Sequence, residues 1–133
     1  MKPLINPENL GNAWFIENLK KTNTPDETYQ SLATIDFSST AVSESNELKS
    51  RSSSYIKDSL ASINLVNNSP GYLMYESNST KDSFVVFSEM YYPKGWFAKV
   101  DGVLQPHFSV NYILRGMNIK KGKHTIEFTF DLQ

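Results

Sequence analysis

The chain lacks cysteine, any large excess of charge and any long apolar run. The absence of cysteine excludes a disulfide framework and a thiolate metal site, although it does not identify the cellular compartment. The 13 basic and 14 acidic residues leave a formal net charge of −1, so the charge favours neither a nucleic acid nor an anionic membrane surface as a partner. The first residues, MKPLINPENL, are polar and contain prolines where a signal peptide needs an unbroken apolar stretch. Taken alone, the sequence predicts a soluble, untargeted chain.

What the sequence does contain is β-alternation, which is clearest at its C-terminal end. There an inward set of side chains alternates with a polar set, and the inward set is His124, Ile126, Phe128, Phe130 and Leu132. The run FVVF at 84–87 is apolar on both faces, which predicts a central strand covered on both sides. About eight short strands with turn signals every 8 to 12 residues predict a mainly β fold, an antiparallel β-sandwich or jelly-roll-like arrangement. We expect residues 1–133 to form one such domain around a single core.

Two further stretches also favour strands. The alternation over Ala13 to Leu19 predicts one mostly covered strand near the N-terminal end. Phe108, Val110, Tyr112 and Leu114 share one parity and are expected to form the inward face of another strand.

One short accessory helix is expected near residues 25–33. Thr24 stands at an N-cap position, Pro25 at the first helical position, and Glu27 where its side chain can reach back to the cap amide. The 3.6-residue period then predicts that the helix packs through Tyr29, Leu32 and Ala33.

The segment 38–54 is the least core-like part of the chain, because 8 of its 17 residues are serine. We expect a short strand at Thr40–Ser43 followed by an exposed loop or hairpin, so that the segment is a polar excursion from the domain. A linker between two domains is the competing interpretation, but the residues before it do not form a self-sufficient core.

Aromatic side chains gather in one stretch, at Tyr91, Tyr92, Trp96 and Phe97. Flat rings with polar neighbours suit sugar binding. Trp96 is in phase with the small apolar residues of its strand, however, and is therefore predicted to pack in the core. Tyr91 and Phe97, on the opposite parity, are the better candidates for exposed contacts with a ligand.

Charged residues near this cluster give a second expectation. Glu89 lies between hydrophobic residues and Arg115 ends another strand, so the two could form a buried or half-buried ion pair. Tyr91, Phe97, Glu89 and Arg115 together are the candidate binding residues.

The sequence gives little support for catalysis, a metal or a cofactor. His107 and His124 are the only histidines, both are expected at strand ends, and their spacing matches no ligand motif. No Gly-x-Ser-x-Gly elbow or Ser, His and Asp grouping is visible. We therefore expect no catalytic residue, no bound metal and no cofactor. A small hydrolase that uses Glu89, Asp101 and the two histidines is the weakest alternative.

Short motifs, most of them with an aromatic residue or a glycine, follow one another near both ends of the chain. They are Asn6-Pro7 and Leu10-Gly11-Asn12-Ala13-Trp14-Phe15, then Tyr91-Tyr92, Gly95-Trp96, Asp101-Gly102, Asn111-Tyr112, Leu114-Arg115-Gly116 and Gly122-Lys123-His124. In this order the chain resembles the C-terminal extracytoplasmic region of the YfhO family of bacterial polytopic membrane proteins. The middle of the chain, about 36–68, matches only loosely.

The resemblance implies that the chain is a soluble loop domain excised from a larger membrane protein, on the extracytoplasmic face of the bacterial cytoplasmic membrane. The family is similar to multi-span glycosyltransferases, so the parent would be a membrane glycosyltransferase involved in cell-envelope glycosylation. This chain would then be a noncatalytic accessory domain beside the parent's transmembrane region, positioning a glycan, an envelope polymer or a partner protein. The alternative is a carbohydrate-binding module that works independently of membrane chemistry.

Overall fold

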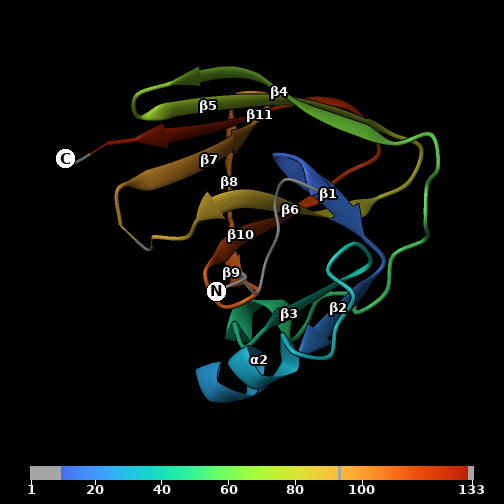
Figure 1. Ribbon diagram of the computed structural model, residues 1–133. Coiled ribbons are helices and arrows are strands. Elements are labelled where there is room, and N and C mark those ends of the chain that lie inside the picture. Colours follow the sequence, from blue (N-terminus) through green and yellow to red (C-terminus); the bar gives the residue numbers. More distant parts are fainter. Residues whose placement is uncertain (1–9, 93, 132–133) are drawn as a thin grey trace.

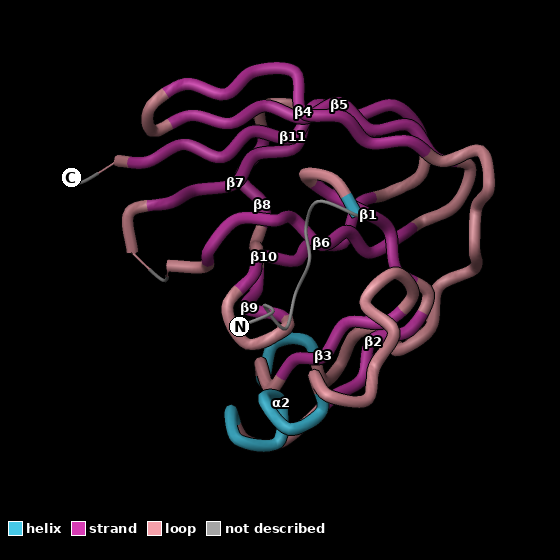
Figure 2. The backbone as a smooth tube through the Cα atoms, viewed as in Figure 1, coloured by secondary structure: helices cyan, strands magenta, loops and turns pink. Residues whose placement is uncertain are grey.

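The computed structural model describes residues 10–92 and 94–131 and is built mainly from two facing antiparallel sheets (Figures 1 and 2). The four-stranded sheet has the order β1-β6-β10-β9, with bounds Ala13–Ile16, Ser83–Met90, Leu114–Ile119 and Phe108–Val110. The five-stranded sheet has the order β4-β5-β11-β7-β8, with bounds Ser62–Ser69, Tyr72–Ser79, Gly122–Phe130, Trp96–Val100 and Val103–Gln105. The predicted mainly β, antiparallel fold is confirmed, and it is consistent with a β-sandwich.

The space between the two sheets holds one hydrophobic cluster, which we call the inter-sheet core. Its buried members come from alternate positions of strands in both sheets: Leu73, Tyr75, Val85, Phe87, Ala98, Met117, Ile119, Ile126 and Phe128. The rings of Tyr75, Phe87 and Phe128 meet edge to face, with centroids 4.9 to 6.1 Å apart. Period-2 alternation therefore places one side of each strand against the facing sheet.

The four-stranded sheet is covered on its other face as well, by a layer built from residues 18–48. Here β2 (Asn18–Lys21) pairs in parallel with β3 (Thr40–Ser43), and helix α2 (Pro25–Ser31) connects them. A short 3-10 helix, η1 (Asn46–Leu48), follows β3. Central strand β6 is thus buried on both faces, as its run of apolar residues predicts.

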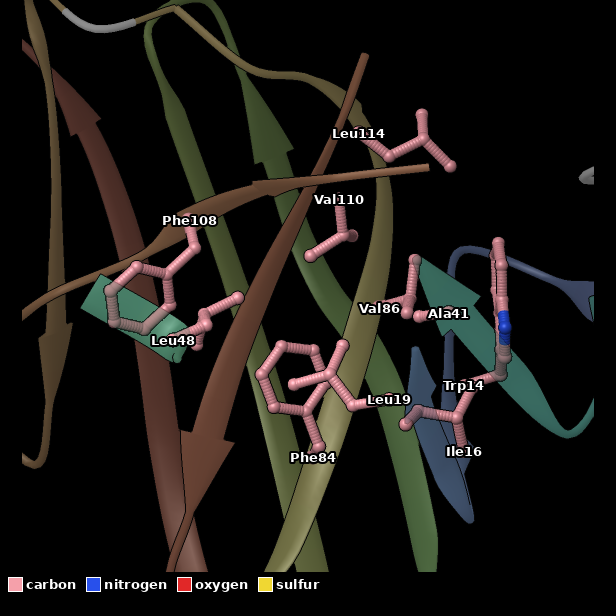
Figure 3. Packing of buried hydrophobic residues seen from close by; sticks show 10 residues of the cluster. All are labelled: Trp14, Ile16, Leu19, Ala41, Leu48, Phe84, Val86, Phe108, Val110 and Leu114. Atoms are coloured by element: carbon pink, nitrogen blue, oxygen red, sulfur yellow. The ribbon is translucent and has the colours of Figure 1, made fainter. Parts of the chain in front are cut away.

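Figure 3 shows the second cluster, the outer core, between the four-stranded sheet and this layer. Its buried members are Trp14, Ile16, Leu19, Ala41, Leu48, Phe84, Val86, Phe108, Val110 and Leu114. Ala41 and Leu48 belong to the serine-rich segment and are fully buried, as is Val42 beside them. The strand expected at Thr40–Ser43 is present, but the loop expected to be exposed after it contains the fully buried Leu48, so part of the expected excursion belongs to the core.

Helix α2 begins where the capping signature predicts. The Thr24 hydroxyl oxygen accepts from the Glu27 amide (3.2 Å), and Glu27 Oε1 accepts from the amide of Asn23 (2.7 Å), one residue earlier than expected. The predicted packing stripe is off by one position. Thr28, Ser31 and Leu32 are buried, whereas Tyr29 is 52% exposed, because the layer beneath the helix offers hydroxyl partners rather than a flat apolar sheet.

Two predicted strands are each divided in two. The stretch from Ala13 to Leu19 leaves the four-stranded sheet at Glu17, whose amide donates to Ser39 O (2.8 Å), and continues in β2. The stretch from Phe108 to Leu114 is interrupted by a turn in which Asn111 and Tyr112 have positive φ, so Tyr112 points outward and is 46% exposed. Alternation alone cannot reveal such breaks, because parity continues through them.

Some predictions fall outside the described residues, namely Leu132 on the last strand and Asn6-Pro7 of the family resemblance. Among the residues that the structure does describe, no helix is long and apolar enough to cross a membrane.

Candidate ligand pocket

An open pocket of about 440 Å³ lies at one end of the five-stranded sheet and is lined by Gly71, Tyr92, Lys94, Trp96 and Phe130. Trp96 begins β7 and Phe130 ends β11, and the register places them directly opposite one another. Their ring centroids are 5.3 Å apart. Aromatic walls with a few polar groups, in a volume of roughly 300 to 1,000 Å³, are typical of small-ligand pockets.

Gly95 fixes the shape of this pocket. Its φ is +92°, and a Cβ atom at this position would lie 2.5 Å from a ring carbon of Phe130. The Phe130 ring can therefore lie against the backbone just before Trp96 only because residue 95 has no side chain. The amide of Asp131 donates to the Gly95 carbonyl (2.6 Å) and holds the two strand ends together.

Beneath Trp96 lies the buried Arg115, which is 2% exposed. Its guanidinium carbon is 4.4 Å from the Trp96 ring centroid and 4.9 Å from that of Phe128, distances typical of cation–π contacts. Nε donates to the Met90 carbonyl (2.9 Å), whereas the buried Nη1 has no hydrogen-bond partner in the described part of the chain. A register shift between Leu114 and Arg115 marks the bulge where this side chain enters the sandwich.

The predicted ion pair between Glu89 and Arg115 is not formed. Among the described residues, the salt bridge found is that of His124 with Asp101. Burial lowers the pKa of Arg115, and the charge of half-buried Glu89 opposes this effect from a longer distance. Glu89 is therefore a distant counter-charge for the guanidinium rather than its partner.

Tyr91 lies next to the pocket but faces His107, with ring centroids 5.4 Å apart. His107 also packs on Phe128 (5.5 Å), and its Nε2 lies 3.4 Å from the carbonyl oxygen of Trp96. Burial lowers the pKa of His107 below its usual 6.5, so the ring is neutral at neutral pH. Tyr91 is half-buried rather than the freely exposed contact that we expected.

Phe97, the other predicted contact residue, is 48% exposed, as expected for the parity opposite Trp96. It lies beside Thr129 on the outer face of the five-stranded sheet, away from the inter-sheet core. None of the four candidate binding residues lines the pocket: Arg115 stacks on the Trp96 ring beneath it, Glu89 and Tyr91 are half-buried outside its lining, and Phe97 lies on another surface.

Trp96 differs from its predicted role as a core residue. It packs against the inter-sheet core and is only half-buried, because its ring also borders the pocket. Sequence reasoning missed Lys94 and Phe130 as pocket residues, and it weighed Tyr92 only as part of the aromatic cluster. Only the strand register, which the sequence does not give, shows that the Gly95-Trp96 turn lies opposite the end of the last strand.

Two of the four residues of the hydrolase alternative, Asp101 and His124, lie away from this pocket and from His107, which contacts Trp96. His124 Nδ1 lies 2.6 Å from Asp101 Oδ2, and His124 Nε2 lies 3.0 Å from the Lys121 carbonyl oxygen. Asp101 and His124 lie at the opposite end of β7 and β11 from Trp96 and Phe130. Both ring nitrogens face acceptors, so neither is free to take a proton from a substrate. In the part of the chain described here, no group of three or more His, Cys, Asp or Glu residues could hold a metal ion.

Comparison of the chain with protein-family models, with curated proteins and with solved structures gives no match. The family resemblance thus rests on the order of residues in the sequence alone.

Proposed function

We propose that this chain is a noncatalytic accessory domain that binds a sugar unit of a cell-envelope glycan in the pocket lined by Tyr92, Lys94, Trp96 and Phe130. The resemblance to the YfhO family places it, in this proposal, on the extracytoplasmic face of a larger membrane protein. The parent's transmembrane region would then carry out the transfer chemistry, while this domain holds the acceptor or product.

The observation that carries the proposal is the support of the Trp96 ring. Arg115 lies 4.4 Å from its centroid and Phe130 lies 5.3 Å from it, and the ring still borders an open pocket. A ring held in this way loses little side-chain freedom when a pyranose stacks on it. The ammonium group of Lys94 and the hydroxyl of Tyr92 are donors for sugar oxygens.

Calorimetric titration of the purified chain with soluble neutral, amino and acidic oligosaccharides tests the binding. Tyr92 and Tyr29 are 51% and 52% exposed, so Tyr92→Ala and Tyr29→Ala remove equally accessible rings from different surfaces. Loss of one aromatic contact predicts about 2- to 12-fold weaker binding for Tyr92→Ala and no change for Tyr29→Ala. Equal affinity of the two variants, or no binding of any sugar, would contradict the proposal.

A separate assay tests whether the domain is noncatalytic. We expect no turnover of nitrophenyl glycosides or polyprenyl-phosphate sugars, because the sequence contains no recognisable nucleophile motif. Glu89→Gln and His107→Ala serve as controls. Turnover that either substitution abolishes would favour the hydrolase alternative.

A further inference from the structure

The outer edge of β1 carries backbone groups that have no partner among the described residues. On the β6 side, Asn12 O accepts from Ser88 N (2.9 Å). On the opposite side, Glu17 N donates to Ser39 O (2.8 Å) and Glu17 O accepts from Tyr55 N (2.7 Å). Because the direction alternates along a strand, the N–H and C=O groups of Ala13 and Phe15 point away from β6. Among the described residues nothing bonds to these four groups, so the pairing that begins at Glu17 stops there.

This edge faces a cleft of about 710 Å³. One wall is β1 with Glu17 and the turn at 36–39, and the other wall is formed by residues of the segment 56–63 that leads up to β4. In Figure 1 this segment rises in green beside the blue β1. Phe15 and Ile63, which are half-buried at the rim of the inter-sheet core, line the cleft together with Ile56, which is 69% exposed. The cleft therefore combines free strand-edge groups with apolar side chains.

The charge of the cleft has one predominant sign. Of the described residues, Glu17, Asp36 and Asp58 line it, against one cation, Lys57. Hydrogen bonds from Ser38 lower the pKa of Asp36, and hydrogen bonds from Thr80 lower that of Asp58, so both carboxylates are charged at neutral pH. A ligand with positive charge near its ends is complementary to this lining.

We propose that an extended peptide segment of a partner protein, with alternating apolar residues and basic flanks, binds in this cleft as an added strand on β1. Its backbone would pair with Ala13 and Phe15, and its apolar side chains would lie beside Phe15 and Ile63. This is β-strand addition, in which backbone bonds give affinity and side-chain sites give selectivity. The four residues of β1 span only about 13 Å, which favours a short peptide over the area that a stable dimer of this chain would need.

A fluorescein-labelled, N-acetylated peptide of sequence KVTVTVK provides a direct probe of the full chain, read by fluorescence anisotropy. Two matched peptides are the controls: EVTVTVE reverses the flanking charge, and KVTVTVK with N-methyl groups on alternate residues keeps the side chains but removes backbone donors. Both methylation registers are made, because either face of the peptide can meet β1. We expect KVTVTVK to bind, EVTVTVE to bind more weakly, and one methylated register to show no measurable binding.

Variants of the protein separate charge from backbone pairing. Glu17→Gln should weaken binding of KVTVTVK by about twofold to fivefold, and Lys57→Gln should strengthen it by a similar factor. Ala13→Pro removes one outward N–H at the first position of the strand, where proline is tolerated, and should weaken binding by about 2- to 12-fold. Circular dichroism shows whether each variant is folded.

Amide hydrogen exchange measured by NMR locates the pairing. In the free protein, the amides of Ala13 and Phe15 should exchange much faster than those of Trp14 and Ile16, which face β6. KVTVTVK should slow exchange at Ala13 and Phe15. Binding that is unaffected by N-methylation, protection elsewhere in the chain, or no binding at millimolar peptide would each overturn the proposal. Protection that grows with protein concentration in the absence of peptide would replace the partner peptide by a second copy of the chain.

Discussion

The two faces of the four-stranded sheet are covered in different ways. The inter-sheet face meets a second sheet of long, regularly alternating strands, and its core is almost wholly apolar. The outer face meets a layer of four-residue strands and short helices, rich in serine and threonine, which contributes only Leu19, Ala41 and Leu48 to the outer core. The four-stranded sheet is thus covered on one face by alternating apolar side chains of another sheet, and on the other face by a layer that contributes a few buried apolar residues.

Hydrogen bonds from side chains to the backbone provide what the outer layer lacks in apolar area. Asn111 is fully buried; its side-chain Oδ1 accepts from Val42 N (2.9 Å), and its backbone N–H donates to Val42 O (2.7 Å). The Ser43 hydroxyl donates to the Ser109 carbonyl (2.6 Å). These bonds join β3 to the β9 end of the sheet and fix its position. A polar segment can therefore be an integral layer when its few apolar residues and its hydrogen bonds act together.

Among the substitutions that test this comparison, Leu48→Ala should lower the stability of the fold the most. Leu48 is fully buried in the outer core, so truncation should lower the free energy of unfolding by about 2 to 5 kcal/mol. Leu60→Ala is the matched control, because Leu60 is 78% exposed and its loss should change stability by about 0.5 kcal/mol or less. Urea unfolding followed by circular dichroism measures both. Equal, small effects would mean that the serine-rich segment is not part of the folded core.

Asn111→Ala tests the polar anchoring. The substitution leaves the buried amide of Val42 without its partner and places alanine at a φ of +49°, so we expect a loss of about 1 to 3 kcal/mol. Asn111→Gly removes the same hydrogen bond but accepts the positive φ, and it should lose less. Chemical denaturation of the two variants separates the bond from the backbone strain. If glycine is as stable as asparagine, the side-chain bond contributes nothing.

Thr24→Ala should have a smaller effect, about 1 kcal/mol, because it removes the side-chain cap of α2. Thr24→Ser keeps the hydroxyl and should restore most of the stability. The effect should also appear as faster amide exchange within residues 25–31 while the inter-sheet core keeps its protection. Uniform loss of protection throughout the chain would show that the outer layer and the sandwich unfold as one unit.

The regular strands of the sandwich could be predicted from the sequence better than the outer layer. Regular alternation identified the last strand, β11, and the apolar run at 84–87 predicted the double burial of β6, because both patterns are local properties of the sequence. Neither pattern could place Leu48 in a core or pair β2 in parallel with β3, since both depend on contacts between segments about 20 to 70 residues apart. Capping chemistry predicted the start of α2 correctly, but which side of the helix is buried depends on the layer beneath it.

The candidate pocket was predictable only in part, for a similar reason. The aromatic cluster and the importance of Arg115 followed from residue type. The partnership of Trp96 with Phe130 follows from strand register, and the stacking of Arg115 on Trp96 from a bulge. Glu89 was expected to neutralise Arg115 directly, but two aromatic rings flank the guanidinium instead. Contacts of this kind have no signature in a single sequence.

The smallest expected effect concerns the pair of His124 and Asp101 in the five-stranded sheet. Their hydrogen bond raises the pKa of His124 above its usual 6.5 and lowers that of Asp101 below 3.8, where the Thr125 amide also donates to the carboxylate. A raised histidine pKa stabilises the fold fully below pH 6.5, and this contribution is lost as the pH rises through the raised value. A lowered aspartate pKa stabilises above pH 3.8, and this contribution is lost as the pH falls through the lowered value.

The two contributions overlap between about pH 3.8 and 6.5, so the pair should stabilise most in that window. Asp101 is 52% exposed, and solvent screening limits the gain to about 0.5 kcal/mol. Urea midpoints of the wild type and of Asp101→Asn should therefore differ most near the middle of the window, and the difference should shrink as the pH rises through the raised pKa of His124. Asparagine tolerates the positive φ of position 101, so the turn itself is kept. An NMR titration gives the independent check, because His124 should titrate above 6.5 and the buried His107 below it; the reverse order would show that the Asp101 contact does not hold His124 in its charged form.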